Sequence, residues 1–330
     1  MKKFVNNVDD ILTESLTGFG NAHNDILEVK LSPNFITRKL KPSYPKVALI
    51  SGGGSGHEPL HGGFVGYGML DAACPGQVFS APTPDQMEAA ANYVHSGKGI
   101  LFIVKNYSGD IMNFEMGAEM LDLEHQTIIV NDDVAVEDST YTTGRRGVAG
   151  TMIVEKTVGS LAETGASLDE CKIFGDHVNK MTASMGVAFT SCTVPAAGKP
   201  TFDIGSDEME FGVGIHGEPG RKREKIKTAN EITSELMGAI LEDLKPSNNQ
   251  EVLLHANGFG GTPLMELYLL FNSAKNILDQ NNIKVTRSLV GNFTTSLDMA
   301  GGSLTVAKLD DKIVQHWDSP VHTPAMRWKI

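Results

Sequence analysis

The stretch Lys46-Val47-Ala48-Leu49-Ile50-Ser51-Gly52-Gly53-Gly54-Ser55-Gly56-His57-Glu58-Pro59 decides the fold class of this chain. Its aliphatic beginning predicts a buried strand over 47–50. Glycines follow directly, and because they carry no Cβ they let the backbone come close to a ligand. His57 adds an imidazole that can move protons near neutral pH. The alternative interpretation is a tight strand-to-helix turn that carries a histidine by chance.

The rest of the first half alternates strands and helices. Further strands are predicted at 99–104 and 127–130, and helices at 83–95, 112–123 and 151–163. Such alternation predicts a largely parallel sheet with helices on its faces. Ligands of such sheets bind beyond the carboxyl ends of the strands. The three strands end in the glycine-rich loop, in 105–110 and in 131–133, so polar segments gather where a ligand is expected.

The second half predicts another α/β unit. Helices are expected at 229–244 and 263–280, with strands at 251–254, 284–290 and 303–309. The fold class that follows is α/β, with two α/β domains, each a mostly parallel or mixed sheet flanked by helices. We place the domain boundary near residue 183, which gives an N-terminal domain over 1–183 and a C-terminal domain over 184–330.

Composition excludes several classes of partner. The 330 residues carry a formal net charge of -12, which argues against nucleic acid as the main partner and against docking on an anionic membrane. No apolar stretch is long enough to span a bilayer, and the first ten residues lack the apolar core of a signal peptide. The three cysteines are widely spaced and form neither a CxxC metal pair nor a disulfide framework. We therefore expect a cytoplasmic protein with reduced thiols, with no metal site in this chain.

Three side chains outside the opening stretch are candidates for chemistry. His216 lies between glycines, so an accessible imidazole there is suited to act as base, ligand or nucleophile; the alternative is a histidine that packs in an ordinary loop. Asp110 is suited to accept a proton from a hydroxyl, or to cap the helix that follows. Lys105 is suited to bind a substrate oxygen, or to be a solvated strand end.

Charged pairs near the third strand have structural and functional interpretations. Asp132 and Asp133 indicate either a Mg²⁺ site or ordinary polar groups at a strand end. Arg145 and Arg146 are suited to grip a phosphate or an acidic partner surface, or to form a charge cluster at a helix entry. The chain has no GxxxxGK[ST] pattern, and His57 stands where a GxGxxG fingerprint would have its last glycine. A nucleotide site inside the chain is therefore poorly supported.

Taken together, the motifs resemble the dihydroxyacetone-binding K subunit of dihydroxyacetone kinases, of the bacterial phosphoenolpyruvate-dependent type. The resemblance covers the chain from near residue 7 to near residue 329. It rests on six segments that occur in the order of the family: 51–59, 105–114, 131–147, 193–200, 208–220 and 317–325.

The resemblance implies roles for individual residues. In that family the histidine that matches His216 adds its Nε2 to the carbonyl of dihydroxyacetone and forms a covalent hemiaminal. Because glycerol has no carbonyl, this covalent step implies a selectivity that hydrogen bonds to similar hydroxyls cannot supply. The substrate-binding residues of the family match Gly54, Ser55, Gly56, His57, Lys105, Asp110 and His216. Of these, His57 and Asp110 are the acid/base candidates beside His216, and we assign the general base first to His57.

The resemblance also implies partners. An ADP-carrying L subunit, with its Mg²⁺, would donate the phosphoryl group after an M subunit recharges it, so no cofactor is expected in this chain. Because the chain ends at Ile330 without the nucleotide domain of single-chain ATP-dependent relatives, we expect a subunit rather than a complete phosphoenolpyruvate–glycerone phosphotransferase. A homodimer is implied as well. The alternative function is a non-catalytic K-like coactivator that binds dihydroxyacetone and regulates a transcription factor.

Overall fold

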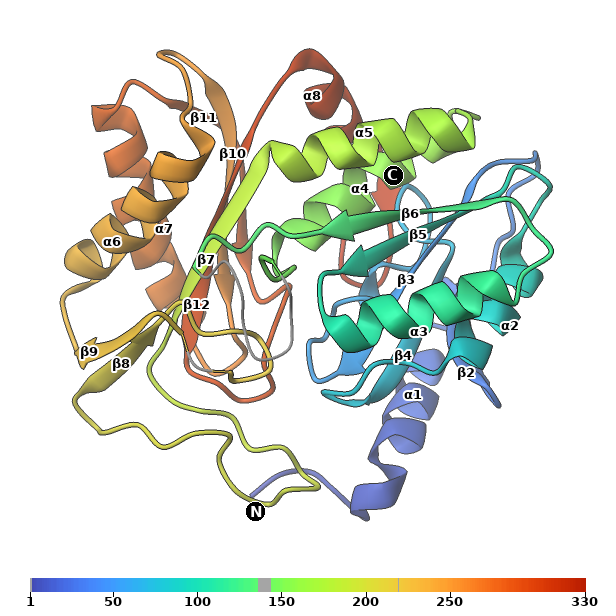
Figure 1. The fold of residues 1–330 in the computed structure, drawn as a ribbon, viewed down its shortest axis with the longest axis horizontal. Coiled ribbons are helices and arrows are strands. Elements are labelled where there is room, and N and C mark those ends of the chain that lie inside the picture. Colours follow the sequence, from blue (N-terminus) through green and yellow to red (C-terminus); the bar gives the residue numbers. More distant parts are fainter. Residues whose placement is uncertain (1, 136–143, 219) are drawn as a thin grey trace.

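Two six-stranded sheets organise the computed structural model, which describes residues 2–135, 144–218 and 220–330 (Figure 1). The first sheet has the order β1-β2-β4-β3-β5-β6, and the second has the order β11-β10-β12-β7-β8-β9. The predicted class, two α/β units with parallel or mixed sheets flanked by helices, is confirmed.

The first sheet has a parallel centre. Strand β3 pairs in parallel with β4 and β5, and β5 pairs in parallel with β6, whereas β1 and β2 form an antiparallel edge. Its strands are β1 (Leu27–Leu31), β2 (Asn34–Arg38), β3 (Ala48–Ser55), β4 (Ala72–Val78), β5 (Ile100–Lys105) and β6 (His125–Val130). The predicted strands at 47–50, 99–104 and 127–130 therefore exist.

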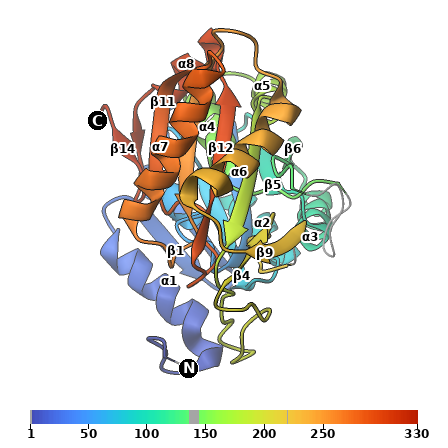
Figure 2. The same cartoon turned by 90° about the vertical axis from the view of Figure 1, so that its left-hand side faces the viewer.

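Helices cover both faces of this sheet. One face packs against α2 (Pro84–Val94) and α3 (Ser108–Glu119), and the other against α4 (Gly150–Glu163) and α5 (Leu168–Lys180). Helix α1 (Ile11–Ala22) and a 3₁₀ turn (Val8–Asp10) extend from the body at the N-terminal end (Figure 2). Burial of apolar side chains on both faces explains why the central strands are almost continuously hydrophobic.

The second sheet is mixed and mostly antiparallel, with β10 and β11 its parallel pair. Its strands are β7 (Thr182–Ala188), β8 (Glu208–Phe211), β9 (Lys222–Lys225), β10 (Glu251–Gly258), β11 (Lys284–Gly291) and β12 (Gly301–Lys308). Helices α6 (Ala229–Leu244) and α7 (Leu264–Gln280) cover its outer face with a shared apolar core (Figure 1). The expected elements of the second half are thus present.

The C-terminal segment returns to the first half of the chain. Helix α8 (Asp311–Trp317) packs on α4, and the short strands β13 (Val321–His322) and β14 (Arg327–Trp328) follow it. The amide of His322 donates to the carbonyl of Tyr67, and Trp317 belongs to the core around α4. Strand β7 begins at Thr182, but because the C-terminal segment joins the first core, the boundary at residue 183 stays a prediction.

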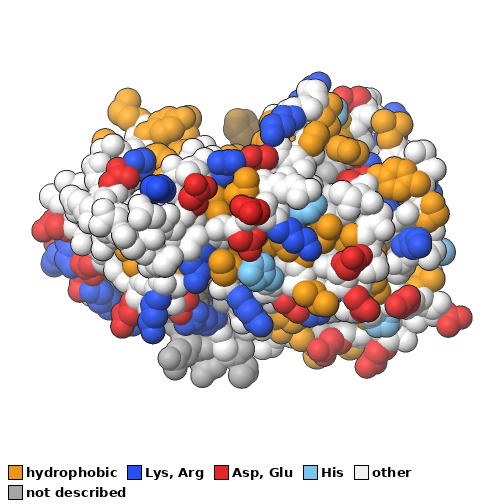
Figure 3. Space-filling model, turned by 90° about the horizontal axis from the view of Figure 1, so that it is seen from above, with side chains coloured by type: hydrophobic (Ala, Val, Ile, Leu, Met, Phe, Trp, Pro, Cys, Tyr) orange, Lys and Arg blue, Asp and Glu red, His pale blue; other side chains and the backbone are white. Residues whose placement is uncertain are grey.

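The surface carries both signs of charge. Figure 3 shows acidic and basic side chains interspersed over the face that it presents. In the described part of the chain, no helix combines the length and the apolar character needed to cross a bilayer.

Candidate active site

The glycine-rich stretch is part of a strand, which corrects the predicted loop. Strand β3 continues to Ser55, and Gly52, Gly53 and Gly54 all pair in parallel with β4. The sequence suggested a loop because glycine is rare in strand interiors. Here the glycines are required by close neighbours: a Cβ on Gly53 would lie 2.4 Å from Lys105 Nζ, and one on Gly54 2.6 Å from the amide nitrogen of Ser80.

The end of β3 turns at Gly56 and docks on the second half of the chain. Gly56 has φ +108°, a conformation that favours glycine. The carbonyl of Gly56 accepts a hydrogen bond from the amide of Leu297, and the Thr295 hydroxyl donates to the carbonyl of Glu58 at 2.9 Å. The candidate site is therefore built where the two sheets meet.

His57 and His216 lie against each other at this junction. Their ring centroids are 4.6 Å apart and their planes are nearly perpendicular, at 88°. The Phe79 ring stacks on His57 at 5.0 Å, and the Tyr107 ring meets His216 edge-on at 4.6 Å. The structure thus brings together the two histidines that the sequence singled out in different halves.

Hydrogen bonding fixes the tautomer of His57. Its Nδ1 lies 2.8 Å from the carbonyl oxygen of Thr295, which can only accept, so Nδ1 carries the proton. Its Nε2 is buried without a partner and keeps its lone pair. Burial, with further contributions from His216 and Lys105, lowers the pKa of His57 well below its usual range. A neutral imidazole with a free Nε2 is equipped to accept a proton.

His216 is neutral for similar reasons. Burial, followed by the charges of Lys105 and Arg146, lowers its pKa to about 3. Its Nδ1 is buried without a hydrogen-bond partner and lies 4.0 Å from Oε1 of Glu218. The ring still exposes 14% of its surface. A small movement would let Nδ1 donate to Glu218 and leave the lone pair on Nε2, the form that a nucleophilic imidazole needs.

Lys105 and Asp110 complete the cluster on the side of β5 and α3. The Lys105 side chain is fully buried, and its Nζ donates to the carbonyl of Gly52 at 3.3 Å and lies 3.7 Å from Oδ2 of Asp110. Lys105 is therefore not a solvated strand end. The N-cap of α3 is Tyr107, and Asp110 lies within the first turn, so the capping interpretation of Asp110 is wrong. Burial raises the pKa of Asp110, and Lys105 opposes this shift.

Two other residues that the sequence singled out, Ser55 and Asp132, make structural hydrogen bonds. The Ser55 hydroxyl donates to the carbonyl of Gly76 at 2.7 Å. The carboxylate of Asp132 accepts from the amides of Val148 and Gly150, and within the described residues no cluster of potential metal ligands is found. These contacts support the ordinary structural interpretation of Asp132.

The interpretation of Arg146 as a surface group that meets a partner is wrong. Its side chain has no exposed surface, and its Nη2 lies 2.7 Å from Oδ2 of Asp133. Its Nη1 lies 3.7 Å from Glu218 and has no hydrogen bond. Arg145 remains partly exposed and bonds Asp243. Residues 136–143 and 219, which belong to two of the six recognised segments, lie outside the described residues.

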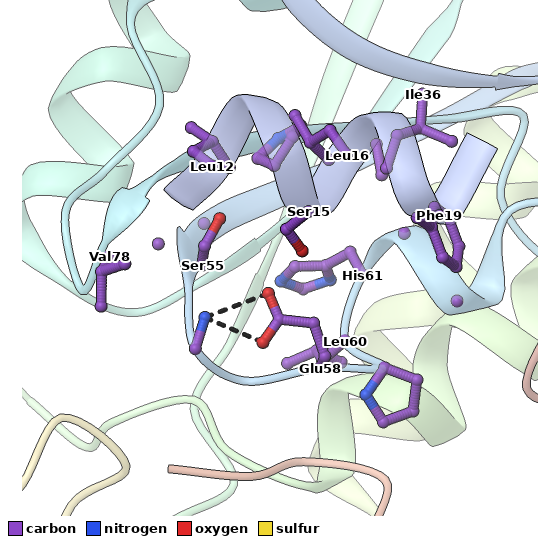
Figure 4. A pocket seen from close by; sticks show the side chains of 18 of the residues that line it. Leu12, Ser15, Leu16, Phe19, Ile36, Ser55, Glu58, Leu60, His61 and Val78 are labelled. Atoms are coloured by element: carbon purple, nitrogen blue, oxygen red, sulfur yellow. Dashed lines mark hydrogen bonds between the residues drawn. The ribbon is translucent and has the colours of Figure 1, made fainter. Parts of the chain in front are cut away.

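A cavity of about 490 Å³ is lined by Gly53, Gly54, Ser55 and Gly56, but not by the side chains of His57, Lys105, Asp110 and His216. It lies between α1 and the end of β3, and its lining is mainly apolar, with Leu12, Leu16 and Phe19 on the helix side (Figure 4). His61 lines it on the other side, next to the glycines of β3.

Sequence reasoning did not identify several residues of the site. His61, Glu155 and the aromatic rings of Phe79 and Tyr107 were not predicted to contribute. Glu155 carried a signal, because a carboxylate directly after the apolar run 152–154 in a predicted helix indicates a buried charge that needs a partner. Phe79 carried none, since its place depends on the packing of β4 against β3.

Comparisons with known proteins identify the family of the chain. The family model of the Dak1 domain matches residues 17–325. The chain is 44% identical, over 99% of both chains, to the dihydroxyacetone-binding subunit DhaK of the PEP-dependent dihydroxyacetone kinase of Escherichia coli (strain K12). It is 48% identical, over 94% of both chains, to the corresponding subunit of the PTS-dependent kinase of Lactococcus lactis subsp. lactis (strain IL1403).

A solved structure of a related protein has the same fold over nearly the whole chain. The dihydroxyacetone kinase operon co-activator DhaQ superposes with a TM-score of 0.88 at 33% identity, covering 94% of this chain and 97% of its own. The chain therefore belongs to the Dak1 domain family, among the K subunits of the dihydroxyacetone kinases.

Proposed function

We propose that this chain is the dihydroxyacetone-binding subunit of a phosphoenolpyruvate-dependent dihydroxyacetone kinase. The observation that carries the proposal is a pair of neutral imidazoles, His57 and His216, whose ring centroids lie 4.6 Å apart at the junction of the two sheets. Each ring has one buried nitrogen without a hydrogen-bond partner. The similar protein of Escherichia coli is named as the dihydroxyacetone-binding subunit of a PEP-dependent kinase, and that of Lactococcus lactis as the corresponding subunit of a PTS-dependent kinase. Both match this chain over at least 94% of its length.

In the first step, Nε2 of His216 attacks the carbonyl carbon of dihydroxyacetone. A carbon–nitrogen bond forms, the carbonyl π pair moves to oxygen, and that oxygen gains a proton while the imidazole loses the one on Nδ1. Glu218, 4.0 Å from Nδ1, is placed to accept this proton. The proton gained by the carbonyl oxygen comes from solvent, so one proton is lost and one is gained. The product is a hemiaminal that keeps all atoms of the ketone. A ligand without a carbonyl cannot form it, so this step would discriminate against glycerol.

In the second step, a terminal hydroxyl of the bound ketone is presented for phosphorylation. We assign the removal of the hydroxyl proton to His57, because its Nε2 is free while its Nδ1 donates to the carbonyl of Thr295. Asp110 is the second acid/base candidate, and the two act as a coupled pair. Lys105 and the backbone of Gly54, Ser55 and Gly56 would hold the remaining oxygens. Fixing the hydroxyl in this way lowers the entropic cost of in-line attack.

The phosphoryl donor is proposed to be a partner. We infer an L subunit that carries ADP and Mg²⁺, recharged by an M subunit, with this chain acting as a cytoplasmic homodimer. Mixing the protein with L and M subunits, phosphoenolpyruvate and dihydroxyacetone should produce dihydroxyacetone phosphate. No product above the level of a mixture without this chain would refute the kinase assignment.

The similarity to the co-activator DhaQ supports a second candidate, a subunit that binds dihydroxyacetone and regulates a transcription factor. Its identity of 33% is lower than the 44% and 48% of the kinase subunits. If the reconstituted mixture is inactive while dihydroxyacetone still adds to His216, the co-activator assignment gains support.

A further inference from the structure

A fully buried carboxylate lies behind the candidate site. Glu155 is on α4 and has no exposed surface. Its Oε1 lies 2.5 Å from Nδ1 of His61, and its Oε2 has no hydrogen-bond partner. Burial of a carboxylate costs free energy unless its charge is balanced, so Glu155 needs a partner in the folded protein.

The ring of His61 connects this carboxylate to Lys105. Nε2 of His61 lies 2.8 Å from Lys105 Nζ. An ammonium group has only donors, so Nε2 accepts and the ring proton is on Nδ1. The Ser51 hydroxyl, 2.9 Å from Nδ1, donates to the carbonyl of Ile103 at 2.6 Å. Glu155 therefore faces a ring nitrogen that donates, which is the arrangement a carboxylate requires.

This chain of contacts supplies a counter-charge for Lys105. The lysine is fully buried, and Asp110, the carboxylate nearest to Nζ, is 3.7 Å away, beyond a good hydrogen bond. Glu155 provides a second negative charge through the polarisable ring. Burial raises the pKa of Glu155, and the charge of Lys105 opposes this shift. The Nδ1–H of His61, 2.5 Å from Oε1, adds a donor that favours the ionised carboxylate. The carboxylate and the ammonium group therefore depend on each other.

We propose that His61 and Glu155 are positioning residues that hold the Lys105 ammonium group, with His61 as the neutral Nδ1–H tautomer between a cation and an anion. Two of the three N–H groups of Lys105 are then directed to His61 and to the carbonyl of Gly52. The third is left for the side where Gly53 and Asp110 lie. In this way a carboxylate on α4, which need not touch the ligand, determines where Lys105 donates.

The role assigned to Lys105 rests on the proposed function, but the positioning itself can be tested without any ligand. The ¹⁵N spectrum of the histidine rings should show His61, identified by the loss of its signal in His61→Gln, as the neutral Nδ1-protonated tautomer at pH 7 and at pH 9. A ring protonated on Nε2, or on both nitrogens, would overturn the proposal.

A double-mutant cycle tests the coupling of the two charges. Glu155→Gln and Lys105→Met are compared alone and together by urea denaturation. Removal of the carboxylate should be more favourable to stability when Lys105 is already absent, because Glu155 is then an unbalanced buried charge. Additive effects on the urea midpoint would mean that Glu155 only fills space in α4, and the proposal would be wrong.

Binding of dihydroxyacetone gives a third measurement. Glu155→Gln should weaken adduct formation about tenfold or more, as expected for loss of a hydrogen bond to a charged group. Thr157→Val is the matched control, since its hydroxyl is buried on the same helix and bonds only to carbonyls of that helix. It should change neither the His61 signal nor the adduct.

The two proposals fail in different ways. If the wild-type protein forms no adduct, the proposed function is wrong, while the tautomer and the cycle still decide the positioning role. If the wild-type protein forms the adduct and Glu155→Gln forms it equally well, the positioning role is refuted and the proposed function stands.

Discussion

The ring of His216 meets the ring of His57 edge-on, with centroids 4.6 Å apart, although each comes from a different half of the chain. Each ring has a buried nitrogen without a hydrogen-bond partner, Nδ1 in His216 and Nε2 in His57. Such groups cost free energy in a folded protein unless a ligand or a movement satisfies them. The free Nε2 of His57 is therefore open to a ligand, whereas a small movement toward Glu218, 4.0 Å away, would satisfy Nδ1 of His216.

His216→Ala should abolish the covalent adduct, because it removes the attacking Nε2, whereas His57 is assigned to the hydroxyl proton. In the ¹³C spectrum of dihydroxyacetone labelled at the carbonyl carbon, the wild-type protein should convert part of the carbonyl signal into that of a tetrahedral carbon. His125→Gln, a change on β6, is the control and should behave as wild type. An adduct that persists in His216→Ala would show that the nucleophile is misassigned.

His57→Asn should separate binding from turnover. The asparagine amide can still donate to the carbonyl of Thr295, but the lone pair of Nε2 is lost, so we expect adduct formation to persist and kcat to fall roughly 10²- to 10⁴-fold. Asp110→Asn should have the same kind of effect. Reconstituted kinase assays measure turnover, and the ¹³C signal measures binding. Equal losses of both would mean that the residue only positions the ligand.

Glu218→Gln should weaken the adduct without removing it. The carboxylate is within 4.0 Å of Nδ1 of His216, and a neutral amide cannot accept the Nδ1 proton that adduct formation releases. We expect a loss of about 1.5–3 kcal/mol in adduct stability, or roughly 10- to 100-fold in the dissociation constant. Glu224→Gln on β9, a partly buried carboxylate in a surface ion pair with Lys222, is the control. An unchanged dissociation constant in Glu218→Gln would exclude Glu218 from the step.

The sequence predicts the parts of this arrangement that depend on local patterns, and it does not predict those that depend on contacts between residues distant in sequence. The strand before the glycines, and His57, Lys105 and Asp110 near strand ends, follow from local patterns that parallel sheets impose. That Gly52 to Ser55 stay in the strand does not follow, because the reason lies in neighbours distant in sequence, such as Lys105 and Ser80. The burial of Arg146 likewise depends on Asp133 and on the loop that carries Glu218.

Gly53→Ala should disrupt the site while leaving the fold intact. A Cβ at this position would lie 2.4 Å from Lys105 Nζ, so the lysine must move away from His61. We expect adduct formation to fall about tenfold or more, since a hydrogen bond of a charged group is lost. Gly238→Ala on α6 is the matched control: nothing lies within 4 Å of its added Cβ, and it should stabilise the protein by about 0.5–1 kcal/mol. Retained adduct in Gly53→Ala would contradict the need for close approach at this glycine.

Stability should fall as the solution is acidified below pH 6.5. Burial lowers the pKa of His216 to about 3 and that of His255 to about 4, and it also lowers the pKa values of His57 and His61. The unfolded chain binds protons at these groups near pH 6.5, whereas the folded protein does not. Stability from this source is therefore complete above pH 6.5 and is lost as pH falls toward the folded-state pKa values.

Below pH 6.5 and above its folded-state pKa, each such histidine changes the free energy of unfolding by roughly 1.4 kcal/mol per pH unit. Urea denaturation at pH 7, 6 and 5 measures the sum. His255 lies away from the candidate site. In His255→Gln the slope of the free energy of unfolding against pH should be smaller than in the wild-type protein, by up to the contribution of one histidine. Adduct formation should be retained. Buried carboxyl groups with raised pKa values, such as Asp133 at about 6, contribute slopes of the opposite sign, so the comparison of the two proteins is the test. Equal slopes in His255→Gln and in the wild-type protein would contradict a neutral, buried His255.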